Sequence, residues 1–402
     1  MNNFLTRTAG FLLAFGIFFT VSCSTFNNTQ EGTDTHSDQN LHESLEDLNE
    51  QIQDSPQNVD LKIRKARLLF ELAKNQSLPA PRLPYYQNLR NTADDIGRQS
   101  DSEHSELDNI IEQAWSLEQS NGVALLQQDS TSNFEQYFET IIDHFDNAIT
   151  IQPDSIVTYN LQATTYYKHG NISKAVESLK VADEIENGSN RTIKERLAYL
   201  YLEAGNLDEA IRHYDLLVTE YPDLGHLKHG LVNAYILNDN HQQAVNLLSE
   251  LSEQYPARYE YQEALATEKF HIFKNEIHQV TSGQSFDSNE ANKFIEEIDS
   301  ISAIFDSLST QMPAYEETTY RIAAFYKEAA FELNRLAALI DNEESAALTS
   351  RVNDLYEQAL PYWQELTETN PDNMGYMKNL FEIYVSLDME EEAEAIQRSF
   401  NF

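Results

Sequence analysis

Apolar residues recur at three- and four-residue spacing over most of the chain, as in amphipathic helices that bury one face. Between residues 154 and 256 this pattern occurs three times, with a period of about 34 residues. The matched positions carry a tyrosine, a turn residue and an alanine: Tyr166, Gly170 and Ala175; Tyr201, Gly205 and Ala210; Tyr235, Asp239 and Ala244. A fixed period of this length predicts an array of helical hairpins, each packed against the next.

The residue types at these positions have physical reasons. Alanine lets two antiparallel helices approach closely, and tyrosine fills the space between hairpins. Gly170 and Gly205 can adopt the left-handed backbone conformation that ends a helix, and Asp239 tolerates that conformation. Pro222 and Pro256 are expected to end the second helices of their copies because proline lacks a backbone donor.

This segment resembles the tetratricopeptide repeat family in three consecutive stretches: YNLQATTYYKHGNISKAVESLKVADEI, LAYLYLEAGNLDEAIRHYDLLVTEYP and LVNAYILNDNHQQAVNLLSELSEQYP. The resemblance implies an all-α fold, a right-handed α-solenoid of antiparallel helix hairpins. It also implies that the first helices of the hairpins line a concave groove that binds a protein or peptide.

Weaker copies flank this regular centre on both sides. Before it, Phe138, Phe145 and Pro153 fit a second helix, and after it Trp363 and Pro371 fit another. We therefore expect irregular hairpins over 41–153, three regular hairpins over 154–258, and elongated hairpins with a C-terminal cap over 259–402. A short first helix is expected to end before the proline at position 56.

The start of the chain has the features of an export signal. Arg7 precedes an apolar run over 9–21 that is too short to span a bilayer, and Ser22 precedes Cys23, the only cysteine. These residues resemble a bacterial lipoprotein site, which implies a signal peptide over 1–22 and a lipid on Cys23. Ser24 then favours the outer membrane, and the polar stretch 23–40 is expected to form a flexible tether. An ordinary secreted protein and an uncleaved anchor are the alternatives.

Charge restricts the partners. The chain has 27 Lys and Arg against 66 Asp and Glu, a net charge of −39, which argues against binding nucleic acid. The acidic surface fits solubility or a salty medium, or the steering of a cationic partner. Residues 60–98 reverse the balance, with eight basic and four acidic side chains. This segment is either a solvated helix face or a contact with anionic headgroups or an acidic partner near the membrane.

No motif indicates catalysis. His226 and His229 are one helical turn apart and could chelate a metal, but no third ligand lies at a useful spacing. His271 and His278 form a weaker pair. The sequence has no glycine-rich phosphate loop, no GxSxG motif and no cysteine nucleophile. We expect no cofactor and no metal, and an enzyme is the least favoured class.

The resemblance places candidate binding residues at first-helix positions that packing leaves unused. Their amide, hydroxyl, aromatic and imidazole groups suit a peptide, although each alone could be ordinary surface. These residues are Asn160, Thr164, Tyr167, Lys168, Glu195, Tyr199, Leu202, His226, His229, Asn233 and Ile236. Some family members clamp a C-terminal carboxylate with Lys, Asn and Arg. Here Asn160 is followed by Thr164 and Glu195, so that basic clamp is absent and acidic tails are disfavoured.

These observations predict a non-enzymatic scaffold or adaptor lipoprotein of the bacterial cell envelope. It would bind a protein or peptide in its groove and the membrane through Cys23. The alternative is a substrate-capturing lipoprotein of an outer-membrane nutrient-uptake system. Such proteins carry tryptophans that stack on sugars, and Trp115 and Trp363 are the only candidates here.

Overall fold

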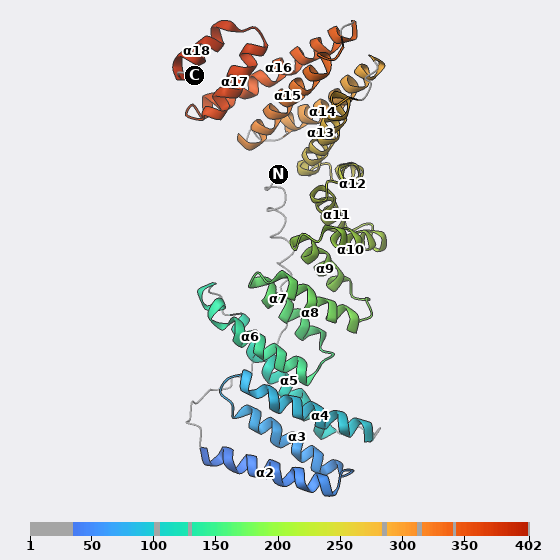
Figure 1. Ribbon diagram of the computed structural model, residues 1–402, viewed down its shortest axis with the longest axis vertical. Helices are drawn as coiled ribbons and strands as arrows, with labels where there is room; N and C mark the ends of the chain where they lie inside the picture. The colour runs from blue at the N-terminus through green and yellow to red at the C-terminus, as the bar shows by residue number, and fades with distance from the viewer. Residues whose placement is uncertain are drawn as a thin grey trace. The chain divides into compact units, whose positions relative to one another are not determined.

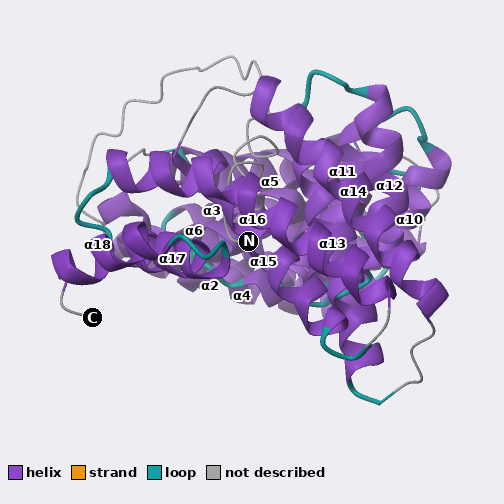
Figure 2. Cartoon of the chain, turned by 90° about the horizontal axis from the view of Figure 1, so that it is seen from above, coloured by secondary structure: helices purple, strands orange, loops and turns teal. Residues whose placement is uncertain are grey.

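The computed structural model describes residues 35–99, 105–127, 131–283, 288–311, 316–340 and 343–400. Every regular element within these ranges is helical (Figures 1 and 2). Successive helices pack as antiparallel hairpins, so the prediction of an all-α solenoid is confirmed. Cys23 and the signal peptide lie outside the described residues. No helix in the described ranges is both long and apolar enough to cross a bilayer.

The described chain divides between Tyr221 and Pro222 into two units, and this division falls inside the predicted regular centre. The N-terminal unit contains α2 (Thr35–Asp54), α3 (Val59–Lys74), the 3-10 turn η1 (Ala80–Arg82), α4 (Leu83–Gln99), α5 (Ser105–Leu126), α6 (Thr131–Ile151), α7 (Ile156–Lys168), α8 (Ile172–Ile185), α9 (Arg191–Glu203) and α10 (Leu207–Glu220). Helix α2 begins inside the range predicted as tether and ends before Pro56.

The C-terminal unit contains α11 (Gly225–Leu237), α12 (His241–Gln254), α13 (Tyr259–Thr281), α14 (Ser288–Gln311), α15 (Glu316–Ala337), α16 (Glu343–Thr369), α17 (Met374–Ser386) and α18 (Glu390–Phe400). Helices α7 to α12 have 13 or 14 residues each, whereas α13 to α16 have 22 to 27. The predicted elongation of the later hairpins is therefore confirmed.

The repeated turn has one hydrogen-bond pattern. In the first regular hairpin the N–H of Asn171 donates to the carbonyl of Tyr166 at 2.9 Å, and Gly170 between them has a φ of 79°. This bond closes the end of the first helix and requires a left-handed residue just before it. Gly205 and Asp239 occupy the same place with φ values of 72° and 54°. The predicted left-handed turns are confirmed, and Asp388 (φ 56°) makes a fourth one in the last hairpin.

The matched alanines lie in the contact between paired helices. Ala175, Ala210 and Ala244 are fully buried. Each amide also donates to the residue that follows its turn, for example Ala175 to the carbonyl of Asn171 at 3.1 Å. The small side chain and the adjoining turn together set how closely each second helix returns along the first.

Candidate functional site

A polar surface shared by α7 and α9 brings together four of the predicted binding residues. Asn160, Thr164 and Tyr167 lie on α7, at spacings that place them on one helical face. Tyr199 lies on α9. All four are partly buried, so packing uses them more than we expected from the sequence.

The centre of this surface is Arg196, which the sequence reasoning missed. Its Nη1 donates to Oδ1 of Asn160 and its Nη2 to Oγ1 of Thr164, both at 2.8 Å. Asn160 also donates to the carbonyl of Ile156, and Thr164 to the carbonyl of Asn160. Asn160 and Thr164 therefore hold the guanidinium in place, and their polar atoms are engaged in doing so.

Arg196 has only neutral acceptors within the described part of the chain, where no carboxylate lies within ion-pair distance of it. Burial lowers the pKa of Arg196 from its ordinary value, but arginine remains charged at neutral pH. In a chain with a net charge of −39, a partly buried cation without an internal counter-charge is unusual. It is the feature of this surface most suited to an anionic group of a partner.

Two tyrosines border the arginine. The hydroxyls of Tyr167 and Tyr199 lie 3.0 Å apart, and their rings meet edge to face with centroids 6.1 Å apart. Burial raises the pKa of Tyr199, and the hydrogen bond with Tyr167 and the nearby Glu203 raise it further. The Tyr199 hydroxyl is therefore neutral at physiological pH, and the two tyrosines offer an aromatic surface with hydroxyl groups next to a cation.

The other predicted residues of the N-terminal unit have different surroundings. Lys168 is exposed and its Nζ lies 5.7 Å from the ring centroid of Phe134, on α6. Glu195 is ion-paired with Arg191 one turn earlier, at 3.1 Å. Leu202 is partly buried. The structure does not join these three to the Arg196 cluster through any polar contact among the described side chains.

In the C-terminal unit, packing uses α11 positions that we expected to be left free. Asn233 is only 6% exposed and its Oδ1 has no hydrogen-bond partner among the described residues. Ile236 packs against the apolar cluster that contains Val232 and Leu248. Asn233 is therefore buried, and Ile236 takes part in apolar packing within the C-terminal unit.

The two histidines of α11 differ from each other. His226 is exposed. The ring of His229 meets Tyr261 edge to face at 5.8 Å. Burial and the nearby Arg258 lower the pKa of His229 to about 4, so its imidazole is neutral at physiological pH. Among the described residues, no three His, Cys, Asp or Glu side chains are placed to hold a metal.

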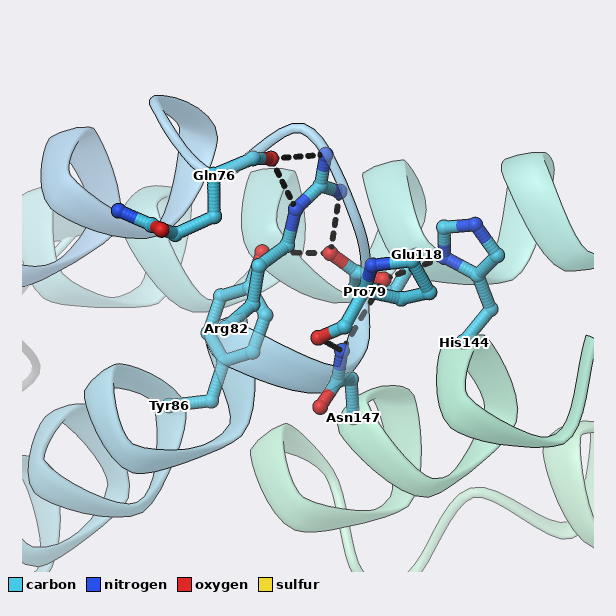
Figure 3. A network of polar contacts seen from close by, with 7 residues as sticks. All are labelled: Gln76, Pro79, Arg82, Tyr86, Glu118, His144 and Asn147. Atoms are coloured by element: carbon cyan, nitrogen blue, oxygen red, sulfur yellow. Dashed lines mark hydrogen bonds and ion pairs between the residues drawn. The ribbon is translucent and has the colours of Figure 1, made fainter. Parts of the chain in front are cut away.

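A second polar cluster, also missed from the sequence, surrounds the fully buried Glu118 of α5 (Figure 3). Its Oε1 accepts from Arg82 Nη1 at 2.9 Å and from the Tyr86 hydroxyl at 2.7 Å. Its Oε2 lies 2.6 Å from His144 Nδ1 and 3.4 Å from Asn147 Nδ2. Burial alone would raise the pKa of Glu118, but the bonds from His144, Arg82 and Tyr86 outweigh it and leave the pKa below its ordinary value.

The same cluster fixes the proline-rich connection between α3 and α4. Arg82 donates from Nε and Nη2 to the carbonyl of Gln76, at 3.0 and 2.8 Å. Asn147 donates to the carbonyl of Pro79 at 2.9 Å. Every charged and polar member is satisfied within the chain, so we assign this Glu118 cluster a structural role (Figure 3).

Internal ion pairs also account for most of the basic segment 60–98. Lys62 pairs with Asp95, Arg67 with Glu106, and Arg90 with Asp94. Lys74 and Arg82 pair with Glu71 and Glu118. These contacts favour neither headgroups nor an acidic partner, because most of the cations already have a counter-charge.

The tryptophans are engaged in packing. Trp115 Nε1 donates to Thr158 Oγ1 and Trp363 Nε1 to the carbonyl of Ala323, both at 3.1 Å. Trp363 is 1% exposed and Trp115 is partly buried. Neither side chain is an open platform for a sugar ring.

Arg196 was not predicted as a binding residue because of the repeat position that it occupies. It aligns with Leu161 in the preceding copy and Gly230 in the following one, and neither position is among the predicted binding residues. The available signal was its three-residue spacing from Tyr199, which puts both on one helical face. Glu118 carried no signal, since its partners are 26 to 36 residues away.

Comparison with known proteins identifies the repeats. Two models described as tetratricopeptide repeat match residues 160–224 and 201–267. Among curated proteins, none matches this sequence. Such repeats are generally non-enzymatic modules for protein interaction.

Several solved structures are similar to this chain at low identity. A tetratricopeptide repeat protein from Parabacteroides merdae is 15% identical over 68% of this chain and 99% of its own, with a TM-score of 0.40. Pseudomonas aeruginosa pilF is 13% identical over 67% and 97%, with a TM-score of 0.38. YrrB, described as having an unusual peptide-binding site, is 15% identical over 58% and 96%, with a TM-score of 0.34.

Proposed function

Because this chain is a tetratricopeptide repeat protein, we propose that it is a non-enzymatic scaffold or adaptor of the bacterial cell envelope. A protein or peptide partner binds the surface shared by α7 and α9, and a lipid on Cys23 holds the chain at the membrane. The observation that carries the binding proposal is Arg196, which Asn160 and Thr164 orient but do not neutralise.

The surface suits a partner segment with a carboxylate. A guanidinium binds a carboxylate through strong, charge-assisted hydrogen bonds, and the neighbouring Tyr167 and Tyr199 add an aromatic contact. The sequence argument against acidic tails rested on the absence of a basic residue here. Arg196 removes that objection, although it supplies a single cation rather than a clamp of several.

Site-specific photo-crosslinking in cells tests this proposal. A photoreactive residue at Glu203, which is exposed and close to Tyr199, should give a defined adduct with the partner. The same residue at Leu216, exposed on α10, is the control and should not give it. Replacing Arg196 with Met should reduce the adduct about tenfold. Equal adducts from both positions, or an adduct indifferent to Arg196→Met, would overturn the assignment of this surface.

The membrane part of the proposal has its own test. Cys23→Ala removes the thiol that would carry the lipid and should move the protein from the membrane fraction to the soluble fraction. Cys23→Ser is the matched control for side-chain polarity and should behave in the same way. Membrane association that survives both substitutions would refute the lipid anchor.

A further inference from the structure

The C-terminal unit has a hollow that is lined by none of the predicted partner-binding residues. It is lined by residues of α15, α16 and α17, those of α16 being Tyr356 and Trp363, and its volume is about 580 Å³. This volume falls within the roughly 300–1,000 Å³ of pockets that bind ligands. Tyr320, Phe331 and Val385 line the hollow and are 42%, 57% and 53% exposed. Large exposed apolar side chains that gather around one depression indicate an interaction surface.

Two of the helices that line the hollow differ in length. Helix α15 has 22 residues and α17 has 13. Side-chain bonds connect the two helices: the Tyr376 hydroxyl donates to Glu316 at 2.8 Å, and further along Lys327 bonds to Asn379 and Glu382. At about 1.5 Å per residue, α15 is about 13 Å longer than α17. Phe331 lies in the C-terminal half of this longer helix and is largely exposed.

The acidic side chains at the hollow are more exposed to solvent than the basic one. Its cation, Lys327, is 21% exposed and is paired with Glu382. Its carboxylates are more open, with Glu382 42% and Glu328 57% exposed, although Glu328 also contacts Lys274. Residues 222–402 carry 11 Lys and Arg against 32 Asp and Glu. The apolar floor is therefore bordered by accessible negative charge.

From these observations we propose that the hollow binds a short segment of a partner protein that carries large apolar side chains flanked by lysine or arginine. The apolar side chains cover Phe331 and Val385, and the basic ones meet Glu328 and Glu382. A hollow of about 580 Å³ is in the size range of sites that bind a small ligand, so it can take a few side chains of a short segment. This inference rests on the proposed scaffold function, but it concerns a different surface from that of Arg196.

Three labelled peptides and fluorescence anisotropy of the full chain test the proposal. A Leu/Lys peptide should bind. A Leu/Glu peptide with the same apolar positions and a Ser/Lys peptide with the same basic positions should each bind about tenfold more weakly or not at all. Phe331→Ser should weaken the Leu/Lys peptide about tenfold. Leu216→Ser is the matched control, because Leu216 is also 57% exposed, and it should leave binding unchanged.

Each other outcome decides against the proposal. Equal effects of Phe331→Ser and Leu216→Ser would show that the peptide binds by charge over the whole acidic surface. Undiminished binding of the Leu/Glu peptide would remove the basic requirement. A concentration-dependent dimer in sedimentation that Phe331→Ser dissociates would assign the hollow to a second copy of the chain. Arg196→Met should not alter Leu/Lys binding, so a failure here and a failure of the Glu203 crosslink are distinguishable.

Discussion

Two arginines of the N-terminal unit are held in contrasting ways. Arg82 meets the buried carboxylate of Glu118 at 2.9 Å, and the surrounding polar groups complete the network. Arg196 meets only the amide oxygen of Asn160 and the hydroxyl of Thr164. The charge of Arg82 is neutralised by a carboxylate within the fold. The charge of Arg196 is held in position by neutral groups, so a partner can neutralise it. The contrast separates a structural cation from a binding cation, although both are well ordered by hydrogen bonds.

The largest effect on stability is expected when the carboxylate of Glu118, which neutralises Arg82, is removed. Glu118→Ala should lower the free energy of unfolding by about 3–5 kcal/mol, because it leaves the largely buried Arg82 side chain without its counter-charge. Urea unfolding of the full chain measures the change. The double variant Arg82→Met with Glu118→Leu should recover most of the loss, since an apolar pair of similar size leaves no buried charge. A single variant as stable as the native chain would mean that the cluster is not a structural element.

The second test concerns His229, whose protonated, cationic form is less stable in the folded chain than in the unfolded chain. His229 has a pKa lowered to about 4 in the folded chain, against about 6.5 when unfolded. Above pH 6.5 both states are neutral and His229 does not affect stability. As the pH falls from 6.5 to 4 the unfolded state takes up the proton first, so roughly 2–3 kcal/mol of stability is lost.

His229→Gln should flatten this part of the pH profile. Thermal melting between pH 7 and pH 4 measures it, and His226→Gln is the matched control because His226 is exposed on the same helix. Profiles that fall equally in both variants would contradict the assignment to His229.

A third test converts the Arg196 site into one like that of Arg82. Asn160→Asp places a carboxylate where Arg196 Nη1 already donates, at 2.8 Å. We expect a gain of about 1 kcal/mol or less in unfolding free energy, reduced by the lost bond to the Ile156 carbonyl. The internal charge should also compete with the partner and weaken the Glu203 adduct. A stronger adduct would show that Arg196 does not meet an anionic group.

The smallest stability effect belongs to Arg196 itself. Arg196→Met keeps the apolar stem and removes a charge that has no carboxylate in reach, so the unfolding free energy should change by less than about 1 kcal/mol. Chemical unfolding beside Glu118→Ala gives the comparison directly. A loss as large as that of Glu118→Ala would make Arg196 a structural residue and remove the reason for the proposed function.

Features that depend on residues close together in the sequence could be predicted, whereas features that depend on contacts between distant residues could not. The turns at Gly170 and Asp239 depend on the conformation of one residue and were predicted correctly. Asp388 has the same geometry but lies in a degenerate copy that offered no repeat to compare. The burial of Asn233 depends on how neighbouring hairpins pack, which spacing along one helix does not reveal.

The binding surface shows the same limit. Tyr167 and Tyr199 were chosen from their register, and the structure does bring their hydroxyls together. Arg196 sits at a register position that packs in the neighbouring copy, so the repeat pattern concealed it. A repeat pattern predicts the features that its copies share. The side chains that differ in a single copy, such as Arg196, can be assigned a role only from their contacts in the structure.

The Glu118 cluster also has a kinetic consequence. Most helices here contact their immediate neighbours, and such local contacts favour rapid folding. The cluster is different, since it joins residues as far apart as Pro79 and Asn147, 68 positions along the chain. Contacts that close long loops form late, so we expect this network to slow unfolding rather than to accelerate folding. The buried carboxylate then determines how long the N-terminal unit remains folded once it has formed.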